Sequence, residues 1–236
     1  MEEETSERLK TLQLIEEYIA KKNKEDIPVN SMGAEAIAGM TQNASNKPFY
    51  TFLGTFLSPQ THDEKTFEAV KTLHTTFGEL TPEIINHTSL ETLQKCIKMV
   101  GFAKTKSKRL KECCKIFIEK YDGKVPSTFD ELCALPGVGT KIASLILAIA
   151  FDCHVAIPVD THVFTISNRL EWADATTPES TRIQLEEWLP KDKWSTFNKV
   201  LVSFGQCCCT KKSPKCSECP LQQARRCPYY LHTLQK

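Results

Sequence analysis

The chain has 236 residues, of which 41% are hydrophobic and 25% are charged, and this composition is that of a globular protein rather than a disordered one. Thirty Lys and Arg residues against 29 Asp and Glu residues give a net charge of +1, so the overall charge gives no argument for a nucleic-acid partner. The longest apolar stretch, residues 142–151, is too short to cross a bilayer, and the first residues lack the pattern of a secretory signal. We expect an intracellular protein without membrane contact.

Helical periodicity dominates the chain, and no segment has the period-two alternation of a strand. The spacing of apolar residues predicts helices over residues 7–22, 49–57, 63–77, 140–151 and 191–204. Residues 23–46 are the expected irregular stretch. The predicted fold class is all-α.

Several residues carry signals for helix ends. Thr81 and Thr177 each precede a proline, which is the pattern of an N-cap followed by proline at the first helical position. Thr88 and Thr128 each have a glutamate three residues later, as in a capping box. Gly205 follows the last apolar segment and predicts its end.

Basic residues gather in two stretches although the chain as a whole is nearly neutral. Residues 101–125 hold eight Lys or Arg residues against three acidic ones, and residues 204–236 hold six against Glu218 alone. Such stretches can form a local field that attracts phosphates. The first stretch is equally well explained as the solvated face of a helix.

Cysteine is frequent, with eleven residues. An odd number without a secretory signal indicates a reducing compartment, with metal binding or buried thiols rather than disulfides. Six of the eleven lie between Cys207 and Cys227. The other five lie in apolar or helical patterns and act most simply as small buried hydrophobes: Cys96, Cys113, Cys114, Cys133 and Cys153.

A glycine-containing turn, Leu-Pro-Gly-Val-Gly at residues 135–139, separates two predicted helices. Gly137 and Gly139 on either side of Val138 permit positive φ and leave backbone N–H groups uncovered. Together with the N-terminus of the second helix, these groups form a phosphate site, as in a helix-hairpin-helix that holds the DNA backbone without reading sequence. An ordinary tight turn is the alternative, and the full five-residue pattern between two helices argues against it.

Lys141 falls in the first turn of the second helix. The positive end of the helix dipole favours a neutral amine there, which is the form that a covalent amine nucleophile needs. A charged lysine that contacts a second phosphate stays open as an alternative. Asp160 follows nineteen residues later, and a helix of about 15 Å followed by an extended segment of up to about 30 Å allows the two side chains to meet. Asp160 can also be the N-cap of a helix that begins at Thr161.

Four cysteines near the end of the chain have the spacing of a metal-binding loop. They are separated by six, two and seven residues: Cys209, Cys216, Cys219 and Cys227. A single Cys-x-x-Cys pair in a nineteen-residue loop suits a four-thiolate iron–sulfur cluster better than a structural zinc, which usually has two such pairs. Cys207 and Cys208 are further candidates for the first ligand. The loop also displays three lysines between its first two ligands, Lys211, Lys212 and Lys215.

Together these motifs resemble the endonuclease III family of DNA base-excision repair glycosylases, over residues 26–228. Residues 135–143 resemble the hairpin motif with its catalytic lysine, and residues 159–163 resemble the catalytic aspartate motif. Residues 58–63 resemble the segment whose glutamine, here Gln60, enters the duplex opposite the damaged base. Residues 168–172 and 185–190 are similar to the eukaryotic branch. The last gap between cysteines departs from the family, in which it usually has five residues.

The resemblance implies two helical domains on either side of a DNA-binding cleft. One is a six-helix barrel at residues 47–153, with a helix-hairpin-helix at residues 128–151. The other is a discontinuous domain with a 4Fe-4S cluster, formed by residues 1–46 and 154–236. The expected site residues are Lys141 and Asp160 for catalysis, Gln60, Gly137, Val138, Gly139, Lys211, Lys212 and Lys215 for DNA binding, and Cys209, Cys216, Cys219 and Cys227 for the cluster.

The implied function is base-excision repair by a monomer that acts on double-stranded DNA. A glycosylase step would remove an oxidised pyrimidine, and a lyase step would cleave at the abasic site by β-elimination through a lysine Schiff base. The nearest alternative is a monofunctional mismatch glycosylase, but relatives of that kind that carry a cluster typically lack a lysine at this position. A non-catalytic helix-hairpin-helix DNA-binding module and a zinc-dependent nucleic-acid binder are further alternatives. The eukaryotic resemblance implies a nuclear location, and no mitochondrial presequence is evident.

Overall fold

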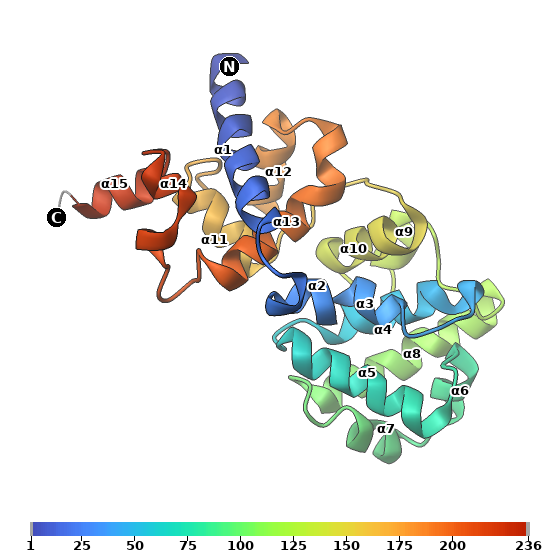
Figure 1. The fold of residues 1–236 in the computed structure, drawn as a ribbon. Coiled ribbons are helices and arrows are strands. Elements are labelled where there is room, and N and C mark those ends of the chain that lie inside the picture. Colours follow the sequence, from blue (N-terminus) through green and yellow to red (C-terminus); the bar gives the residue numbers. More distant parts are fainter. Residues whose placement is uncertain (1, 235–236) are drawn as a thin grey trace. The chain divides into compact units, whose positions relative to one another are not determined.

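The computed structural model describes residues 2–234, with side chains up to residue 231, and within them every regular element is a helix. The all-α prediction is thereby confirmed. The chain divides into two compact units, which we call the inner unit (residues 28–155) and the terminal unit (residues 1–27 and 156–236). Figure 1 shows the helices of both. In the described range, no helix combines the length and the hydrophobicity needed to cross a membrane.

The inner unit is a bundle of short and medium helices around one hydrophobic core. Its helices are α2 (Pro28–Met32), α3 (Ala34–Ala38), α4 (Lys47–Leu57), α5 (Asp63–Phe77), α6 (Pro82–His87), α7 (Leu90–Cys96), α8 (Ala103–Tyr121), α9 (Phe129–Cys133) and α10 (Thr140–Phe151). Every residue of α4 from Phe49 to Leu57 is buried, because α3, α5 and α10 pack around it (Figure 1). The rings of Phe52 and Phe117 meet edge to face with centroids 5.0 Å apart and join α4 to α8.

Residues 23–46 contain helices where the sequence predicted an irregular stretch. The segment holds α2 and α3, with the 3₁₀ turns η1 (Lys24–Asp26) and η2 (Ala44–Asn46) on either side. The prediction was wrong there because a helix of five residues is too short to display a helical period. Gly54 lets α3 approach α4, since a β-carbon on this glycine would lie 3.1 Å from Cδ1 of the buried Ile37. This packing places residues 28–46 in the inner unit, whereas the resemblance assigned them to the cluster domain.

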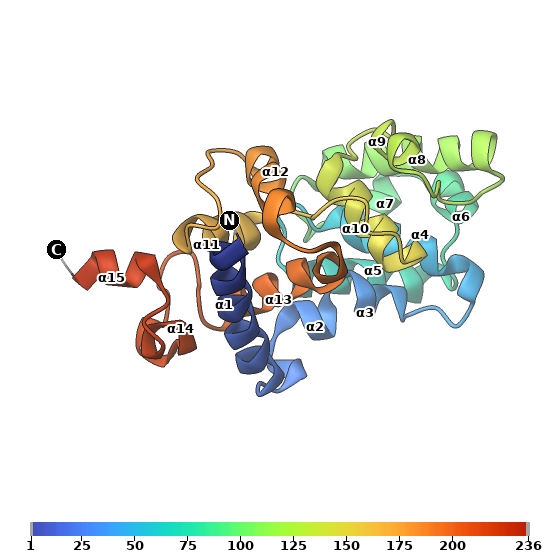
Figure 2. The same ribbon diagram turned by 90° about the horizontal axis from the view of Figure 1, so that it is seen from above.

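The terminal unit joins the first helix of the chain to its last third. Its elements are α1 (Glu2–Ala20), η1, α11 (Thr161–Arg169), α12 (Pro178–Trp188), η3 (Lys191–Lys193), α13 (Trp194–Cys207), η4 (Cys216–Glu218), α14 (Pro220–Gln223) and α15 (Pro228–Leu234). Helix α1 packs on α13 and α14, and α11 packs on α12 and α13 (Figure 2). Leu12 and Ile15 of α1 are buried in a core that also holds Trp172 and Phe197, whose rings lie 6.0 Å apart.

Three of the four predicted threonine caps are present. Thr81, Thr128 and Thr177 each accept a hydrogen bond from the backbone N–H three residues later, and they begin α6, α9 and α12. The prediction for Thr88 was wrong, because Thr88 ends α6 and the next residue, Ser89, is the N-cap of α7.

The helix end predicted at Gly205 was also wrong, because α13 continues to Cys207. A β-carbon at Gly205 would lie 2.3 Å from Nδ1 of His162 on α11. The glycine therefore permits the close packing of two helices and does not terminate one.

Candidate functional site

The predicted hairpin turn joins α9 to α10 in the inner unit. Gly137 has φ +86°, in the left-handed region that favours glycine, whereas Gly139 precedes α10 with an ordinary φ of −114°. The N–H of Val138 donates to the carbonyl of Leu135 at 3.1 Å, and the Val138 side chain is buried. In the described range, the N–H groups of Gly137 and Gly139 have no backbone partner, and α10 has no side-chain cap. These donors are uncovered at the start of α10, an arrangement suited to binding an anion, and the buried Val138 side chain anchors the turn.

Lys141 lies in the first turn of α10, immediately beyond these donors. Its side chain is half-buried. No described group forms a hydrogen bond or an ion pair with its amine.

Asp160 is the N-cap of α11, as the sequence allowed. Its Oδ1 atom accepts hydrogen bonds from the backbone N–H groups of His162 at 2.9 Å and Val163 at 2.8 Å. The residue before the motif is held as well, since the carbonyl of Pro158 accepts from the Asn198 amide at 2.7 Å. One carboxylate oxygen is thus occupied by the helix end, which fixes the direction of the other. Lys141 belongs to the inner unit and Asp160 to the terminal unit, and the meeting of their side chains stays a prediction.

Gln60 stands at the tip of a tight turn after α4. The N–H of Thr61 donates to the carbonyl of Ser58 at 2.9 Å and closes the turn. Gln60 itself is exposed and has φ +55°, a left-handed conformation that a residue other than glycine adopts only when its surroundings impose it. The turn therefore presents this side chain to solvent in one backbone conformation.

Phe102 lies close to the same turn and was missed by the sequence reasoning. It precedes α8 with φ +58°, and 65% of its surface is exposed, the largest fraction among the large hydrophobic side chains that the structure describes. The adjacent Gly101 donates its N–H to the Thr61 hydroxyl at 2.9 Å, which brings Phe102 beside the Gln60 turn. An aromatic residue before a lysine-rich helix was the available signal, but its exposure depends on tertiary structure. An exposed apolar ring beside an exposed glutamine is suited to entering a base stack.

The four predicted cluster ligands line one small pocket of the terminal unit, together with Cys208. The pocket is otherwise bordered mainly by apolar groups: Leu170, Phe204, Pro214, Leu221 and the ring of Tyr229. In the described residues, no group of three or more His, Cys, Asp or Glu side chains converges tightly enough to hold a single metal ion. The five sulfurs border one shared pocket, which is where a cluster held by cysteine thiolates would lie. Cys227, despite its unusual spacing, lies in this pocket with the others.

The chemistry of these thiols fits an iron–sulfur cluster. Burial raises the pKa of Cys209, Cys216 and Cys227, because a thiolate loses hydration in the pocket. A hydrogen bond from the Cys208 thiol lowers the pKa of Cys219 to about 6. Thiolates in such a place need a nearby positive charge, which iron supplies. Cys208 stays an alternative to Cys209 as the first ligand.

Arg169, the last residue of α11, holds the cysteine loop. Its guanidinium donates to the sulfur of Cys209 at 3.2 Å and to the carbonyls of Thr210 at 2.9 Å and Lys211 at 2.8 Å. It also lies over the ring of Tyr229, 4.8 Å from its centroid. Sequence reasoning did not find this role, because no spacing pattern tells that the end of one helix meets a loop forty residues later.

The basic stretches divide into exposed and buried lysines. Lys211, Lys212 and Lys215 are exposed on the cysteine loop, as predicted. In α8, by contrast, Lys106 is only 9% exposed, and Lys111 is half-buried with its ammonium on backbone carbonyls. Neither a phosphate-attracting field nor a solvated helix face therefore describes the whole of that stretch.

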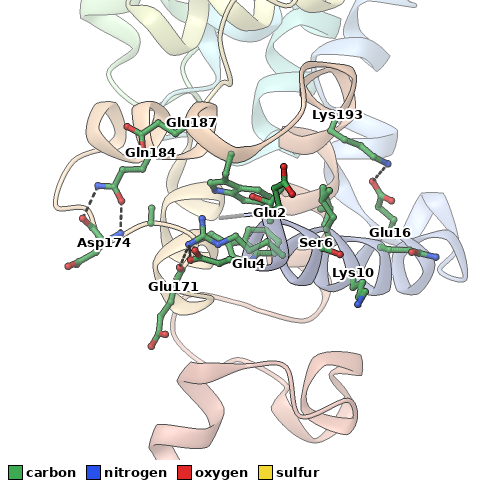
Figure 3. Close-up of a pocket in the computed structure, with 18 residues that line it drawn as sticks. Glu2, Glu4, Ser6, Lys10, Glu16, Glu171, Asp174, Gln184, Glu187 and Lys193 are labelled. Carbon is green, nitrogen blue, oxygen red and sulfur yellow. Dashed lines mark hydrogen bonds and ion pairs between the residues drawn. The ribbon is translucent and has the colours of Figure 1, made fainter.

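A cavity of about 1190 Å³ runs along α1 in the terminal unit. Figure 3 shows its charged side chains, with Lys193 beside Glu16 and the Gln184 amide beside Asp174. Of the sequence-predicted site residues, all of which are described, none lines this cavity. It is thus separate from the candidate site.

Comparison with known proteins gives two family matches. Residues 53–191, more than half of the chain, match the family described as HhH-GPD superfamily base excision DNA repair protein. Residues 209–223 match the iron–sulfur binding domain of endonuclease III. Endonuclease III of Thermotoga maritima is 40% identical over 183 residues, which cover 78% of this chain and 84% of that protein. The chain belongs to the endonuclease III family.

Plant and structural relatives extend this comparison. Endonuclease III homolog 1, chloroplastic, of Arabidopsis thaliana is 41% identical over 214 residues, which cover 88% of this chain and 55% of that protein. The chain therefore spans about half the length of that relative. A solved non-covalent endonuclease III–DNA complex has a TM-score of 0.75 at 30% identity, covering 86% of this chain and 95% of that one. A trapped covalent endonuclease III–DNA intermediate has a TM-score of 0.73 at 29% identity, covering 90% and 99%.

Membership of the endonuclease III family confirms the expected cofactor, a 4Fe-4S cluster. The matched iron–sulfur domain contains Cys209, Cys216 and Cys219 but ends before Cys227. The assignment of the four individual ligands stays a prediction.

Proposed function

We propose that this protein is a bifunctional base-excision repair enzyme, which removes oxidised pyrimidines from double-stranded DNA and then cleaves the abasic site. The observation that carries the proposal is Lys141, an amine in the first turn of α10 beside uncovered hairpin N–H groups, with no hydrogen-bond or ion-pair partner among the described groups. A lysine there distinguishes a Schiff-base enzyme from one that only hydrolyses the glycosidic bond. The endonuclease III relatives and their DNA complexes support the substrate class.

The hairpin, the cysteine loop and the Gln60 turn each supply a different contact to DNA. The N–H groups of Gly137 and Gly139 bind a backbone phosphate, and the exposed lysines of the cysteine loop neutralise further phosphates. Gln60 and Phe102 enter the duplex and fill the space of the extruded nucleotide. Extrusion costs a few kcal/mol and is easiest for a damaged base, which stacks poorly.

The chemistry begins when the neutral amine of Lys141 attacks C1′ of the damaged nucleotide. The C1′–N bond breaks, and the base leaves with its electron pair and takes a proton. Loss of the amine proton and ring opening give a protonated Schiff base between Lys141 and C1′. Removal of a C2′ proton then expels the 3′ phosphate, which cleaves the strand by β-elimination.

Asp160 stabilises the positive charge that develops on the sugar, or takes the proton of the attacking amine. Its Oδ1 is held by the N-terminus of α11, so the other carboxylate oxygen is the one available for this role. A carboxylate fixed by two backbone N–H groups needs no reorganisation when the charge appears.

Cys209, Cys216, Cys219 and Cys227 hold the cluster in this proposal. The cluster would order the loop that carries Lys211, Lys212 and Lys215, and Arg169 ties the same loop to α11. The chemistry of the sugar is assigned to protein side chains alone.

Borohydride trapping tests the function directly. The wild type, incubated with a duplex that carries thymine glycol, should form a covalent complex with DNA when borohydride reduces the Schiff base. Lys141→Ala should form none, while retaining affinity for the duplex. Parallel duplexes with 8-oxoguanine or a mismatch measure the substrate preference. Absence of a trapped species with the wild type, or undiminished trapping with Lys141→Ala, would refute the assignment.

We further propose that the protein acts as a monomer in the nucleus. Similarity to the eukaryotic branch supports this location, although two plant relatives are named as chloroplastic. Light scattering of the protein alone and with a short duplex tests whether it is a monomer. Fluorescence microscopy of the tagged chain in its own cells tests the nuclear location, and an organellar signal would contradict it.

A further inference from the structure

Lys106 is a buried ammonium in the inner unit to which no catalytic or DNA-binding role has been given. Its residue surface is 9% exposed. The Nζ atom donates to the carbonyl of Leu57 at 2.7 Å, to the carbonyl of Pro59 at 2.6 Å and to the hydroxyl of Thr61 at 3.4 Å. Burying a charge is costly unless hydrogen bonds compensate it, and here three acceptors face the three donors of one ammonium.

The three acceptors lie on both sides of Gln60. Leu57 is the last residue of α4, so the ammonium satisfies a carbonyl at the negative end of that helix. Pro59 and Thr61 are the immediate neighbours of Gln60. The ammonium therefore fixes the turn before and after its tip, and holds the left-handed backbone of Gln60 between two fixed residues.

A second tie secures the same turn from the start of α8. Gly101 donates its N–H to the Thr61 hydroxyl, which also faces Lys106. The carbonyl of Gln60 lies against Gly101 so closely that a β-carbon there would be 2.5 Å away. The Gln60 turn thus rests on Lys106 of α8 and on Gly101, which precedes α8, and Lys106 supplies the charged contact.

We propose that Lys106 is a positioning residue for Gln60: its buried ammonium holds the turn in the conformation in which Gln60 enters the duplex and takes the place of the extruded nucleotide. This inference rests on the proposed function, because it concerns the extrusion step of that reaction. Lys106 has no contact with DNA in this role and acts only through Gln60.

Lys111 supplies a matched control on the same helix. Its ammonium likewise has three acceptors, the backbone carbonyls of Ile85, Asn86 and Thr88 at the end of α6. If the two lysines only satisfied carbonyls at helix ends, replacing either one should have the same effect on extrusion and base release. Only Lys106 lies beneath the Gln60 turn.

The experiment compares Lys106→Met and Lys111→Met, each alone and combined with Gln60→Ala. A duplex with 2-aminopurine opposite the lesion reports base extrusion by its fluorescence, and single-turnover base release reports the reaction. DNA affinity and thermal unfolding are measured for every variant. We expect Lys106→Met to slow extrusion and base release at least tenfold with less than threefold loss of affinity, and Lys111→Met to leave both rates within twofold of wild type.

The double variants decide whether Lys106 acts through Gln60. If it does, Lys106→Met causes no further loss of extrusion in the Gln60→Ala background, because the side chain that it positions is already gone. Lys111→Met should have the same small effect in either background. Lys106→Arg, which retains the charge and several donors, should recover part of the extrusion rate.

Equal losses in Lys106→Met and Lys111→Met, or additive losses in Lys106→Met with Gln60→Ala, would overturn the inference. If Lys106→Met fails to fold, Lys106→Arg and Lys106→Gln take its place in the same comparison, and additivity with Gln60→Ala counts equally against the proposal. The 2-aminopurine signal requires DNA binding but no chemistry. A wild type that extrudes the base without releasing it would therefore refute the proposed function and leave the inference on Lys106 open to the same test.

Discussion

The carbonyl oxygen of Gln60 lies against the α-carbon of Gly101, at a distance where a β-carbon would be only 2.5 Å away. The chain thus brings an exposed glutamine into backbone contact with Gly101, which lies just before the lysine-rich helix α8. Thr61 completes the contact by accepting the Gly101 N–H at 2.9 Å. Contacts from Gly101 and Lys106 therefore support the Gln60 turn, in addition to its own hydrogen bond from Thr61 to Ser58.

Replacing Gly101 by alanine should displace the Gln60 turn. The added methyl group meets a backbone carbonyl, which cannot rotate away as a flexible side chain can. We expect a severalfold loss of 2-aminopurine extrusion with DNA affinity largely kept. Gly39→Ala is the control, because its β-carbon would lie 3.3 Å from its nearest atom, the Ala36 carbonyl oxygen, and its near neighbours include no residue of the Gln60 turn. Wild-type extrusion in Gly101→Ala would show that the contact has no role.

The two glycines of the hairpin should respond differently to alanine. Gly137 has φ +86°, and a β-carbon there would lie 2.9 Å from Cδ of Arg109, whereas Gly139 has ordinary φ and open space. Gly137→Ala should lower the free energy of unfolding by about 1–2 kcal/mol more than Gly139→Ala does. Urea unfolding of both variants measures the difference. Equal stability of the two would contradict the assigned backbone conformation.

Asp160 combines a structural and a chemical role, and two substitutions separate them. Asparagine is as good an N-cap as aspartate, so Asp160→Asn should keep the stability and the DNA affinity while it loses most base removal. Asp160→Ala should lose the activity and also about 1 kcal/mol of stability. Base release in single turnover and thermal unfolding give the two readouts. Full activity of Asp160→Asn would disprove the catalytic role.

The cluster ligands can be counted by iron content. The purified protein should contain four irons per chain and absorb broadly at the violet end of the visible spectrum. Cys227→Ala should lower the bound iron and this absorbance, because Cys227 lines the pocket with the other ligand candidates. Cys207→Ala should keep both, since Cys207 is absent from the lining of that pocket. If Cys227→Ala kept its iron and Cys207→Ala lost it, Cys207 would be a ligand in place of Cys227.

Lys106 should make the free energy of unfolding rise with pH above about pH 8. Burial lowers the pKa of Lys106 to about 8. Below about pH 8 the ammonium is protonated in both the folded and the unfolded state. Between that value and the ordinary lysine pKa, the unfolded chain binds a proton that the folded chain lacks, so the free energy of unfolding rises with pH.

The difference between wild type and Lys106→Met isolates this contribution, because other titrating groups cancel. Between pH 8 and pH 10, the free energy of unfolding of the wild type should rise by about 2 kcal/mol relative to that of Lys106→Met. Urea unfolding with reductant present measures this change. The groups that contact the ammonium, two carbonyls and the Thr61 hydroxyl, do not titrate in this range. If the difference in free energy of unfolding between wild type and Lys106→Met stays constant from pH 8 to pH 10, the pKa of Lys106 in the folded protein is not lowered to about 8.

Local patterns were sufficient to predict much of the protein. The helical class, the caps at Thr81, Thr128 and Thr177, and the turn with Gly137 all follow from interactions within a few residues along the chain. The spacing of the cysteines likewise indicated the cluster domain. These features are readable because a cap, a turn or a ligand loop is determined by residues close in sequence.

Tertiary structure alone decided the rest. Gly205 looked like a helix end and instead makes room for His162, and Lys106 looked like part of a basic surface and is buried beneath the Gln60 turn. Arg169 reaches the cysteine loop from the far end of α11. In each case the partner lies forty or more residues away in sequence, where neither periodicity nor spacing carries information. The sequence by itself determined the elements and their chemistry, and packing determined which side chains support the site.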